Sequence, residues 1–545
     1  MAYRLSWHAS RFTFYACARA AGAGVSRLSV LAAIVSFALY FLSAIPRVIY
    51  PYDLDFIEDG LLMQSLRVAN GQPVFLPPNA EFVPHVYMPL YTWLGGLAFR
   101  LTGPGFTPLR LMSFTATIAA ALTIYWIARR ESGQRWAAVT CAGLFFGGYS
   151  ITGGWYELAR VDALFVALSL AGAALAVYGQ RSTRSVFASA LLLALAFLTK
   201  QNAWFFALAA AVHLLLAIGR RAWLFIFAFT AMTVVPIALL HFSTGGWFST
   251  YVFGIAYASP VETQRLVDTL RYEIFGSMAM LTIGFVWMTL DSVVRHRRQA
   301  SVAQPWLWFT GVAVAVSAAG RASVGGNLNN LLPAYAFLCL VPALAMRKWG
   351  YGETQDEAPP QHGEARPPPQ HVEGRGRTLV AALQGRVRAF IRHHAPGWIA
   401  AAILAQFALA AYNPARFLPS TEMREAGDRL IRRIASIDGE VLVLMHPYYA
   451  AMAGKPPGAQ IAAMWHARWR GRDPLPTDFV ERIRNRYYAA IISDESEFFE
   501  MEPALIDLIE ANYARGEGLT VFDAPSTLTG VEVRPRTVYV PLPPQ

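Results

Sequence analysis

The sequence that decides the fold is an apolar run, LSVLAAIVSFALYFLSAI (28–45), followed closely by the acidic segment YDLDFIEDG (52–60). The candidate span around the apolar run, 27–47, is long enough as a helix to cross a hydrocarbon core about 30 Å thick. Comparable apolar runs recur as far as residue 412. Because lipid offers no hydrogen-bond partners to the backbone, these runs are predicted to cross the membrane as helices.

The composition agrees with an integral membrane protein. Of the 545 residues, 55% are hydrophobic and only 15% are charged, whereas soluble domains are about one quarter charged. We interpret the net charge of +11 as a surplus of cations in cytoplasmic loops, and not as a nucleic-acid-binding surface. The three cysteines lie in unrelated segments and form no disulfide or metal pattern. The basic N-terminal stretch is too long for a signal peptide, which favours an uncleaved first span.

Eleven crossings are predicted, with the N-terminus in the cytoplasm and the C-terminus outside. The predicted spans are 27–47, 108–128, 136–152, 161–179, 185–198, 201–218, 222–242, 271–291, 304–320, 329–347 and 397–412. Segment 86–101 is also apolar, but we interpret it as juxtamembrane or re-entrant, because the loop cations then gather on one side. Twelve loop cations lie on the side of the basic N-terminus: Arg129, Arg130, Arg135, Arg181, Arg184, Arg220, Arg221, Arg295, Arg297, Arg298, Arg347 and Lys348. The opposite loops carry four: Arg160, Lys200, Arg265 and Arg321.

Four regions are expected along the chain. Residues 1–347 form a transmembrane domain whose first external loop is 48–107. Residues 348–378, rich in proline, glycine, glutamine and charge, form a disordered cytoplasmic linker. Residues 379–412 form a basic amphipathic helix on the inner leaflet and then the last span. Residues 413–545 form a small extracytoplasmic α/β domain with a partly parallel sheet. Its expected strands are 439–446, 487–494 and 519–525, its helices lie near 421–436, 475–485 and 503–514, and the tail 529–542 could add a hairpin.

The acidic segment is the first candidate for chemistry. If the residues after it are helical, Asp55, Glu58 and Asp59 share one face. Crowded carboxylates repel, so the pKa of one of them should rise toward the range of a general base. Asp53 and Asp55 could also bind a divalent cation. The alternative is structural: Asp55 and Glu58 have the spacing of a capping box, with Asn70 at the helix stop.

Two further outer loops carry charge at helix ends. Arg160 and Asp162 lie at the mouth of the span 161–179, where charge is costly and usually has a task. Interfacial anchoring would explain them as well. Lys200 and Asn202 form a tight polar turn between two spans, and irregular backbone at that depth should line a cavity. The alternative is a plain hairpin turn whose lysine reaches the interface.

The last outer loop before the linker is GRASVGGNLNNLLP (320–333). Arg321 lies beside a glycine-rich turn, and Asn327 and Asn330 lead into the N-terminus of the next span, where exposed amides bind anions. A solvated loop is the alternative for Arg321. Together with the cations of the two preceding loops, Arg321 predicts an outer cavity in which three cations face several carboxylates. Such a cavity suits a phosphate-bearing lipid.

The segment PHVYMPLY (84–91) begins the apolar stretch that does not cross. His85 could donate a hydrogen bond to a phosphate or to a substrate hydroxyl, and Tyr87 could contact the same substrate. The alternative for His85 is an interfacial anchor beside aromatic residues. The sequence contains no GxGxxG, P-loop, HExxH or CxxC motif, so no nucleotide or zinc site is predicted from motifs.

A family resemblance follows from the order of these segments. The acidic residues after the first span, PHVYMPLY, ARVDALF (159–165), TKQN (199–202) and NLNNLLP (327–333) resemble the GT-C glycosyltransferases. The resemblance is particularly to the bacterial branch related to protein O-mannosyltransferases and to the aminoarabinose transferases of lipid A, and it covers about residues 27–347. It implies a polyprenyl-phosphate sugar donor, an external active site and inversion at the anomeric carbon.

The resemblance also implies roles for individual residues. Asp55 or Glu58 matches the catalytic carboxylate of the first loop, and Asp162 matches the acid of the next outer loop. The sequence departs from the family pattern at Met88, where a proline is usual, and at Asp59, where relatives often have glycine.

The expected function is transfer of a sugar from a polyprenyl-phosphate donor on the outer face of a bacterial inner membrane to a glycan, lipid or protein acceptor. The donor phosphate is expected to meet Arg160, Lys200 and Arg321, while Asp55, supported by Glu58, deprotonates or positions the acceptor. Two other classes stay open. A transporter or flippase of a lipid-linked saccharide would show internal repeats and broken helices at midplane. A scaffold would bind a partner through its external domain.

Overall fold

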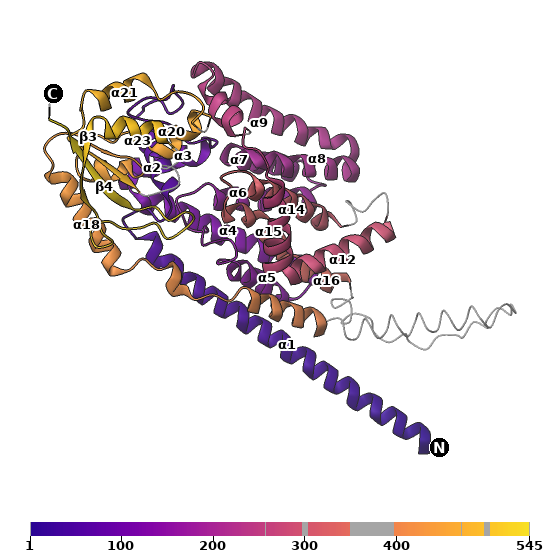
Figure 1. The fold of residues 1–545 in the computed structure, drawn as a ribbon. Coiled ribbons are helices and arrows are strands. Elements are labelled where there is room, and N and C mark those ends of the chain that lie inside the picture. Colours follow the sequence, from indigo (N-terminus) through magenta and orange to yellow (C-terminus); the bar gives the residue numbers. More distant parts are fainter. Residues whose placement is uncertain are drawn as a thin grey trace.

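The computed structural model describes residues 2–256, 258–296, 304–348, 397–469, 471–494 and 502–543. It confirms a mostly helical chain with a small sheet near the C-terminus (Figure 1). The main helices before residue 349 are α1 (Ala2–Val48), α2 (Phe56–Ala69), α3 (Leu90–Thr102), α4 (Phe106–Ser132), α5 (Arg135–Gly147), α6 (Asp162–Tyr178), α7 (Thr183–Thr199), α8 (Trp204–Ile218), α9 (Ala222–Ser243), α12 (Ala279–His296), α14 (Pro305–Ala322), α15 (Leu332–Leu338) and α16 (Val341–Lys348). The predicted amphipathic helix and nearly all of the predicted linker lie outside the described residues.

The helices form a continuous packed bundle. Helix α1 packs on α5, α5 on α4, α4 on α6 and α6 on α7. Helix α9 packs on α7 and lies beside α8 (Figure 1). Small residues allow the closest approaches: a Cβ atom added to Gly143 in α5 would lie 2.2 Å from the Cβ atom of Ala33 in α1. Helix pairs in membranes commonly use such small residues at their contacts.

Membrane-spanning character is clear, but the number of crossings stays a prediction. Among the described residues, four helical stretches are long and apolar enough to cross alone: Ser26–Val48, Phe106–Ser132, Gln201–Ser243 and Leu328–Lys348. Two bent helix pairs pass the same test together, and α6 and α7 are shorter apolar helices. Large apolar side chains such as Phe227 and Phe242 are 68% and 81% exposed on the bundle surface, as expected for groups that face lipid.

Two predicted spans are not continuous helices. The span 271–291 is broken, because Thr263–Ser277 and Ala279–Val294 meet at 99°. The span 329–347 is divided into α15 and α16. Pro342 explains the second break, since it has no N–H group to donate to the carbonyl of Leu338. Segment 86–101, by contrast, becomes the short helix α3, which packs along α2 in the first external loop.

The C-terminal domain has the predicted α/β character. Its sheet has the order β1-β2-β4-β3, with strands β1 (Val441–Val443), β2 (Ala490–Asp494), β3 (Tyr513–Gly518) and β4 (Pro535–Pro541). The pair β1 and β2 is parallel, and β4 is antiparallel to β2 and β3. The helices of the domain are α18 (Thr421–Ser436), α19 (Pro447–Met452), α20 (Ile461–Ala467), α21 (Thr477–Arg484) and α23 (Pro503–Glu510).

Two details of this domain differ from the sequence prediction. Residues 519–525 are not a strand. Their backbone turns because Asp523 accepts hydrogen bonds from the amide and the hydroxyl of Thr520, at 2.9 and 2.6 Å, and such local bonds compete with strand pairing. The tail 529–542 does not form a hairpin of its own; its second half is β4, which fills the gap between β2 and β3.

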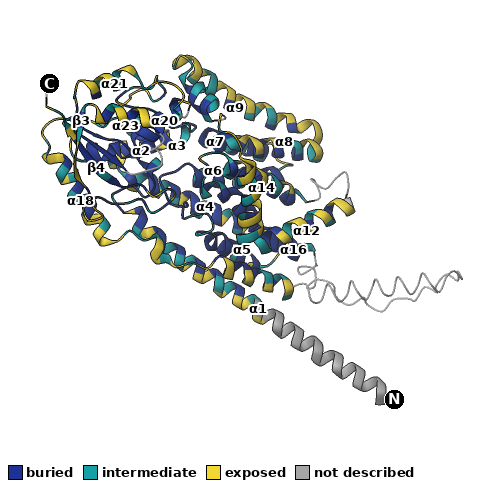
Figure 2. Cartoon of the chain, in the orientation of Figure 1, coloured by how far each residue is buried: buried dark blue, intermediate teal, exposed yellow. Residues whose placement is uncertain are grey.

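The C-terminal domain packs on the first external loop. The amides of Leu528 and Thr529 donate to the carbonyl of Leu54, at 3.1 and 2.9 Å. The amide of Ala459 donates to Ala80, and the carboxylate of Asp478 accepts from the amide of the same Ala80. Buried residues accumulate where the sheet meets α2 and α4, while α9, α12 and α18 carry many exposed residues (Figure 2). The acidic segment is therefore enclosed between the bundle and the domain.

Candidate active site

The acidic segment turns directly into helix α2. Asp55 is the N-cap residue and has extended backbone angles, and Asn70 is the C-cap. The predicted helix and its stop are confirmed. The predicted capping box is not formed, because the side chain of Asp55 makes no capping hydrogen bond. Glu58 reaches back one residue further, and accepts from the amide of Leu54 at 2.7 Å. The Asp55 side chain is thus free for another partner.

Glu58 is held by an arginine that the sequence reading did not single out. Arg110, at the start of α4, donates to both carboxylate oxygens of Glu58, at 2.8 and 2.6 Å. The amide of Ala159 donates to the same carboxylate at 2.6 Å. Both charged side chains are fully buried. Bidentate pairs of this kind fix geometry strongly, so Glu58 ties the first loop to α4 and to the outer loop before α6.

A chain of alternating charges begins at Asp55. Its Oδ2 atom accepts a hydrogen bond from Arg160 at 2.5 Å. The Nε atom of Arg160 lies 3.8 Å from Asp162, the first residue of α6. Asp162 in turn accepts from the ammonium group of Lys200 at 2.7 Å. Three loops that are far apart in the sequence therefore meet in one buried network.

Asp55 combines burial with an unused oxygen. Its side chain is fully buried, and its Oδ1 atom has no hydrogen-bond partner among the described residues. Burial raises the pKa of Asp55 to about 7, against the lowering effect of Arg160, and Glu58 adds to the rise. The predicted rise is confirmed, but desolvation is its largest cause, ahead of repulsion between carboxylates. A carboxyl group with this pKa can accept a proton near neutral pH.

Aromatic groups hold Arg160 in place. The hydroxyl of Tyr87 accepts a hydrogen bond from Arg160 at 2.8 Å, and the guanidinium lies 4.8 Å from the ring centre of Trp155. Burial raises the pKa of Tyr87 to about 12, so this phenol stays protonated. The stacking and hydrogen bonds restrict the guanidinium to one orientation between the two carboxylates.

The asparagine-rich loop supports Lys200. Asn330 accepts from the ammonium group at 3.3 Å, and Asn329, which the sequence reading did not single out, donates to both oxygens of Asp162. Asn327 caps the short helix that follows by accepting from the amide of Leu328. Asn202 lies half-buried in the 3-10 turn after Lys200. Lys200 is 11% exposed, more than Asp55, Arg160 or Asp162.

Arg321 points to a different partner. Its guanidinium pairs with Glu273 at 2.9 Å and donates to the carbonyl of Gly326. The loop itself stays close to the network, because a Cβ atom added to Gly320 would lie 3.0 Å from Asn330. Of the three predicted phosphate-facing cations, the structure joins Arg160 and Lys200 and directs Arg321 toward Glu273.

His85 joins the first loop to the C-terminal domain. Its Nε2 atom lies 2.7 Å from the Oε1 atom of Gln460. The amide nitrogen of Gln460 donates to the carbonyls of Phe56 and Met445, so its oxygen is the acceptor and His85 is the donor. Burial lowers the pKa of His85 to about 3. This imidazole is neutral, and its 4% exposure excludes the alternative of an interfacial anchor.

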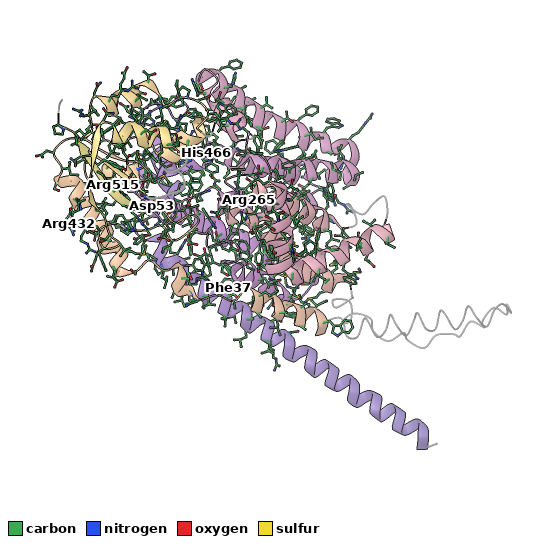
Figure 3. All side chains as sticks on the ribbon, in the orientation of Figure 1. Phe37, Asp53, Arg265, Arg432, His466 and Arg515 are labelled. Carbon is green, nitrogen blue, oxygen red and sulfur yellow. The ribbon has the colours of Figure 1, made fainter. Side chains whose placement is uncertain are left out.

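Asp53 binds a buried histidine of the C-terminal domain. His446 contacts Asp53 through Nδ1 at 2.7 Å and Asp494 through Nε2 at 3.1 Å. The hydroxyl of Tyr449 donates to the other oxygen of Asp53. Burial lowers the pKa of His446, but the two carboxylates raise it more, and it lies well above the usual value. Figure 3 shows Asp53 between the helical bundle and the sheet.

Asp59 also faces the domain. It accepts from the amide of Tyr448, at the start of α19, at 3.1 Å. Burial and the nearby Asp53 raise the pKa of Asp59 well above its usual value. The extra acid of the first loop is therefore part of the contact with the C-terminal domain.

A turn of the C-terminal domain covers the acid. Gly530 adopts a φ of 78°, and a Cβ atom added there would lie 3.2 Å from Asp55 Oδ1 and 3.1 Å from Trp155. The preceding Thr529 accepts a hydrogen bond from Arg47 of α1 at 2.8 Å. The turn is thus held through Thr529, and glycine allows it to approach the free oxygen of Asp55.

The two acids proposed for a divalent cation do not fit one. Both oxygens of Asp53 are used by Tyr449 and His446, and one oxygen of Asp55 is used by Arg160. Within the described residues, no group of three or more histidine, cysteine or acidic side chains is arranged to hold a metal ion. The positive charge at this place comes from side chains of the protein itself.

Most of the site residues that the sequence analysis did not name carry a feature in the sequence that could have indicated them. Arg110 lies within the predicted span 108–128 and Arg47 at the end of the predicted span 27–47. A lone charge at such a position is usually functional or paired. His446 and Asp494 end the predicted strands 439–446 and 487–494, and the carboxyl ends of neighbouring parallel strands meet at one edge. Asn329 lies in the loop 320–333, which the sequence analysis had already proposed as part of the site.

Comparison with known proteins identifies the fold. A sequence model of the dolichyl-phosphate-mannose-protein mannosyltransferase family matches residues 84–247, the part that carries Tyr87, Arg160, Asp162 and Lys200. The structure of ArnT from Cupriavidus metallidurans bound to undecaprenyl phosphate is similar over 95% of this chain and 99% of that chain, with a TM-score of 0.55 and 13% identity. Residues 84–247 therefore resemble that mannosyltransferase family, and the chain as a whole shares the fold of ArnT.

Two further solved structures are similar to the chain. The apo state of the same ArnT gives a TM-score of 0.53 and 14% identity, over 95% of this chain and 99% of that chain. The archaeal oligosaccharyltransferase AglB from Archaeoglobus fulgidus, in complex with an inhibitory peptide and a dolichol-phosphate, gives 0.46 and 13%, over 91% and 72%. No curated protein sequence matches the chain significantly. These matches support the resemblance drawn from the sequence, and the apolar helices agree with a multi-pass membrane protein.

Proposed function

We propose that the chain transfers a sugar from a polyprenyl-phosphate donor to an acceptor hydroxyl on the extracytoplasmic side of the membrane, with inversion at the anomeric carbon. The observation that carries this proposal is the buried network Asp55–Arg160–Asp162–Lys200, in which Asp55 keeps one oxygen free. The ArnT structure of the same fold was determined with undecaprenyl phosphate bound, which supports a donor of this class.

In the proposed step, Asp55 Oδ1 accepts the proton of the acceptor hydroxyl. The acceptor oxygen forms a bond to the anomeric carbon from the side opposite the phosphate. The bond between that carbon and the phosphate oxygen breaks, and its electron pair leaves with the polyprenyl phosphate. Lys200 and Arg160 stabilise the negative charge that develops on the phosphate. Lys200 is the more accessible of the two cations, which suits direct contact with the donor.

The other charged groups act as positioning residues in this proposal. Asp162, together with Asn329, fixes Lys200, and Tyr87 fixes Arg160. Glu58 has donors on both oxygens, so it positions the loop that carries Asp55 and does not take the proton. The transfer needs no metal ion, because the carboxylates that could bind one are paired with protein cations. Activity that survives a chelator would agree with this, and activity that requires an added divalent cation would contradict it.

The test uses a strain that lacks the chain and a plasmid that restores it. The glycolipids, glycans and glycoproteins of the envelope are compared by mass spectrometry, so the sugar need not be known in advance. The unmodified chain should restore the missing product. Asp55→Asn should lower product formation per amount of folded protein by about 10²- to 10⁴-fold, the usual loss on removing a general base. Restoration by Asp55→Asn would overturn the assignment.

Two controls separate chemistry from folding and from transport. Glu58→Gln should lose folded protein as well as product, because it breaks a buried pair. Purified chain in detergent is given the donor lipid and the acceptor, both in envelope extract of the deletion strain. It should release polyprenyl phosphate from the donor lipid. A transporter cannot produce this release, since detergent solution has no second compartment. The anomeric configuration of the product, read by nuclear magnetic resonance, tests inversion.

A further inference from the structure

A cavity of about 390 Å³ opens at the far end of α6 from Asp55. Asp162 is the first residue of α6, and the cavity begins just after its last residue, so the two places are about 25 Å apart along this helix. The lining residues are Gln180, Arg181, Thr183, Val186, Ile218, Arg220, Arg221 and Leu224. They come from the loop before α7, from α7, and from the junction of α8 and α9. The cavity is therefore separate from the candidate active site.

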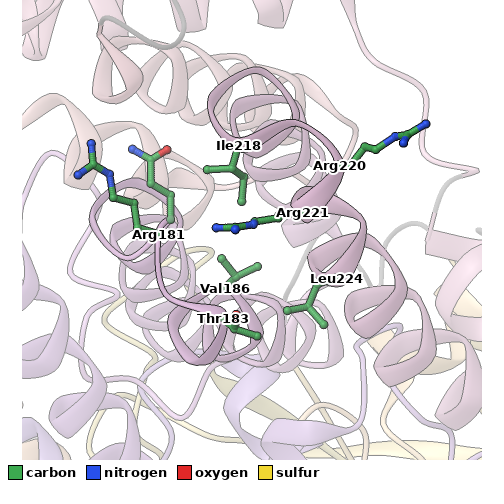
Figure 4. A pocket seen from close by; sticks show the side chains of 8 residues that line it. Arg181, Thr183, Val186, Ile218, Arg220, Arg221 and Leu224 are labelled. Carbon is green, nitrogen blue, oxygen red and sulfur yellow. The ribbon is translucent and has the colours of Figure 1, made fainter.

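Three arginines surround this cavity without a partner. Arg221 extends across it between Val186 and Ile218, while Arg181 and Arg220 line its two sides and extend outward from it (Figure 4). None of the three forms an ion pair or a hydrogen bond with any residue that the structure describes. Three unneutralised guanidinium groups around one cavity favour an anionic ligand, and arginine suits phosphate geometry.

The cavity has an apolar wall that continues onto the lipid-facing surface. Val186, Ile218 and Leu224 line it, and the neighbouring Phe187 and Phe227 are 45% and 68% exposed. A ligand with acyl chains could place its phosphate among the arginines and its chains along this surface. A free phosphate ion would contact the arginines but not the apolar surface. Basic pockets between membrane helices are known binding places for anionic lipid headgroups.

One polar group points to the kind of headgroup. The side-chain oxygen of Gln180 is buried and has no hydrogen-bond partner among the described residues. A buried acceptor without a donor is costly, and a hydroxyl group on the ligand would satisfy it. We propose that this cavity binds the phosphoglycerol headgroup of an anionic membrane lipid, through its three arginines and the amide of Gln180, in the leaflet opposite the candidate active site.

The test measures lipid binding to the purified full chain by native mass spectrometry. Dioleoyl-phosphatidylglycerol should be retained, while dioleoyl-phosphatidylcholine should not. The double variant Arg181→Gln/Arg221→Gln should bind phosphatidylglycerol roughly tenfold more weakly or worse, from the usual contribution of each arginine near a membrane surface. Ile218→Trp, which fills the cavity and keeps every charge, should weaken binding as well. Unchanged elution on size exclusion confirms that each variant is folded.

A matched control uses two other exposed arginines of the same face. Arg135→Gln/Arg184→Gln removes the same charge without touching the lining, and should bind phosphatidylglycerol within about twofold of the unmodified chain. An equal loss in both double variants would overturn the proposal, because general surface charge would then explain binding. Competition by soluble glycerol 1-phosphate at the same concentration as the lipid would overturn the lipid assignment.

Discussion

Asp55 shows how one carboxyl group acquires its proton affinity from its surroundings. It shares the first loop with three other acids, yet each of those is engaged elsewhere: Glu58 with Arg110, and Asp53 and Asp59 with the C-terminal domain. Asp55 alone keeps an oxygen without a donor among the described residues. Its pKa of about 7 follows mainly from burial, moderated by Arg160. The segment therefore separates four similar residues into one reactive group and three structural ones.

This environment predicts the pH dependence of transfer. Asp55 accepts a proton only when it is ionised, so kcat/KM should rise about tenfold per pH unit below about 7 and level off above it. The measurement is the initial rate of transfer between pH 5 and 9 with purified chain. Binding of undecaprenyl phosphate over the same range corrects for ionisation of the lipid. A rate that does not change between pH 5.5 and 8 would contradict a role for Asp55 as base.

At this scale the sequence predicted the place of the site better than the partners of its residues. The spacing of Asp55 and Asp162 relative to the spans predicted that they lie on one side of the membrane, and the structure joins both of them to Arg160. The direction in which a loop side chain points could not be predicted in this way, and Arg321 is the example. Its sequence neighbours are compatible with a side chain that points toward Lys200 or away from it. Arg321 points away because it pairs with Glu273, which lies 48 positions away in the sequence.

At the scale of elements, the turn around Gly530 brings the C-terminal domain close to Asp55. Its approach depends on a left-handed backbone and on the absence of a side chain. The same turn binds Arg47 through Thr529 and Leu54 through two backbone amides. It therefore connects the position of Asp55 to α1.

Gly530→Ala is predicted to impair transfer while leaving the fold in place. The new methyl group would meet Asp55 and Trp155, and the turn must move away from the acid. Transfer should fall about tenfold or more, with a loss of stability of about 1 kcal/mol from the positive φ. Gly454→Ala is the matched control, because Gly454 has a φ of 76° in the same domain and nothing within 4 Å of the added methyl. Equal activity of the two variants would contradict the proposed role of the turn.

Elements were predictable where the pattern was strong and local. The long apolar runs predicted α4, α6 and α7 within a few residues, and the short runs 439–446 and 487–494 predicted β1 and β2. The bend at Met278 and the break before Pro342 were missed because an apolar run has the same composition whether or not its helix is continuous. The strand expected at 519–525 was missed because one side chain, Asp523, turned the backbone.

At the scale of the whole molecule, the C-terminal domain is attached through buried charge. His446 lies between Asp53 of the first loop and Asp494 of β2, with Tyr449 and Asp59 close by. Since the folded pKa of His446 is raised, its contribution to stability is full below its usual pKa of 6.5. That contribution is lost only as the pH rises through the higher folded value. Attachment should therefore be firm at neutral pH and weaken in alkaline solution.

His446→Gln is predicted to loosen the domain. The change leaves two buried carboxylates without their cation, which typically costs about 3–5 kcal/mol. Limited proteolysis in detergent should cut the variant near residues 413–420 faster than the unmodified chain at pH 7. The unmodified chain should approach the variant as the solution is made strongly alkaline. His241→Gln, at the end of α9, is the control and should not change cleavage. Equal protection of both variants would show that the histidine does not hold the domain.

The orientation of the molecule can be tested by labelling. With Cys17, Cys141 and Cys339 replaced by serine, single cysteines are placed at Glu517 in β3 and at Arg135 at the start of α5. A maleimide that does not cross membranes should label Glu517→Cys in intact cells with a permeable outer membrane, and Arg135→Cys only after lysis. The reverse pattern would put the candidate active site in the cytosol, and the proposed function would fail.

The hydrogen bonds from Leu528 and Thr529 to Leu54 have a consequence for biosynthesis. A ribosome makes the acid-bearing loop more than 450 residues before the turn that covers it, because Leu54 and Leu528 are 474 positions apart, so Asp55 cannot be covered by this turn until that long intervening stretch has been made. A nascent or prematurely terminated chain would be inserted in the membrane but would remain inert. Catalytic competence would then report that translation had passed the residues of this turn.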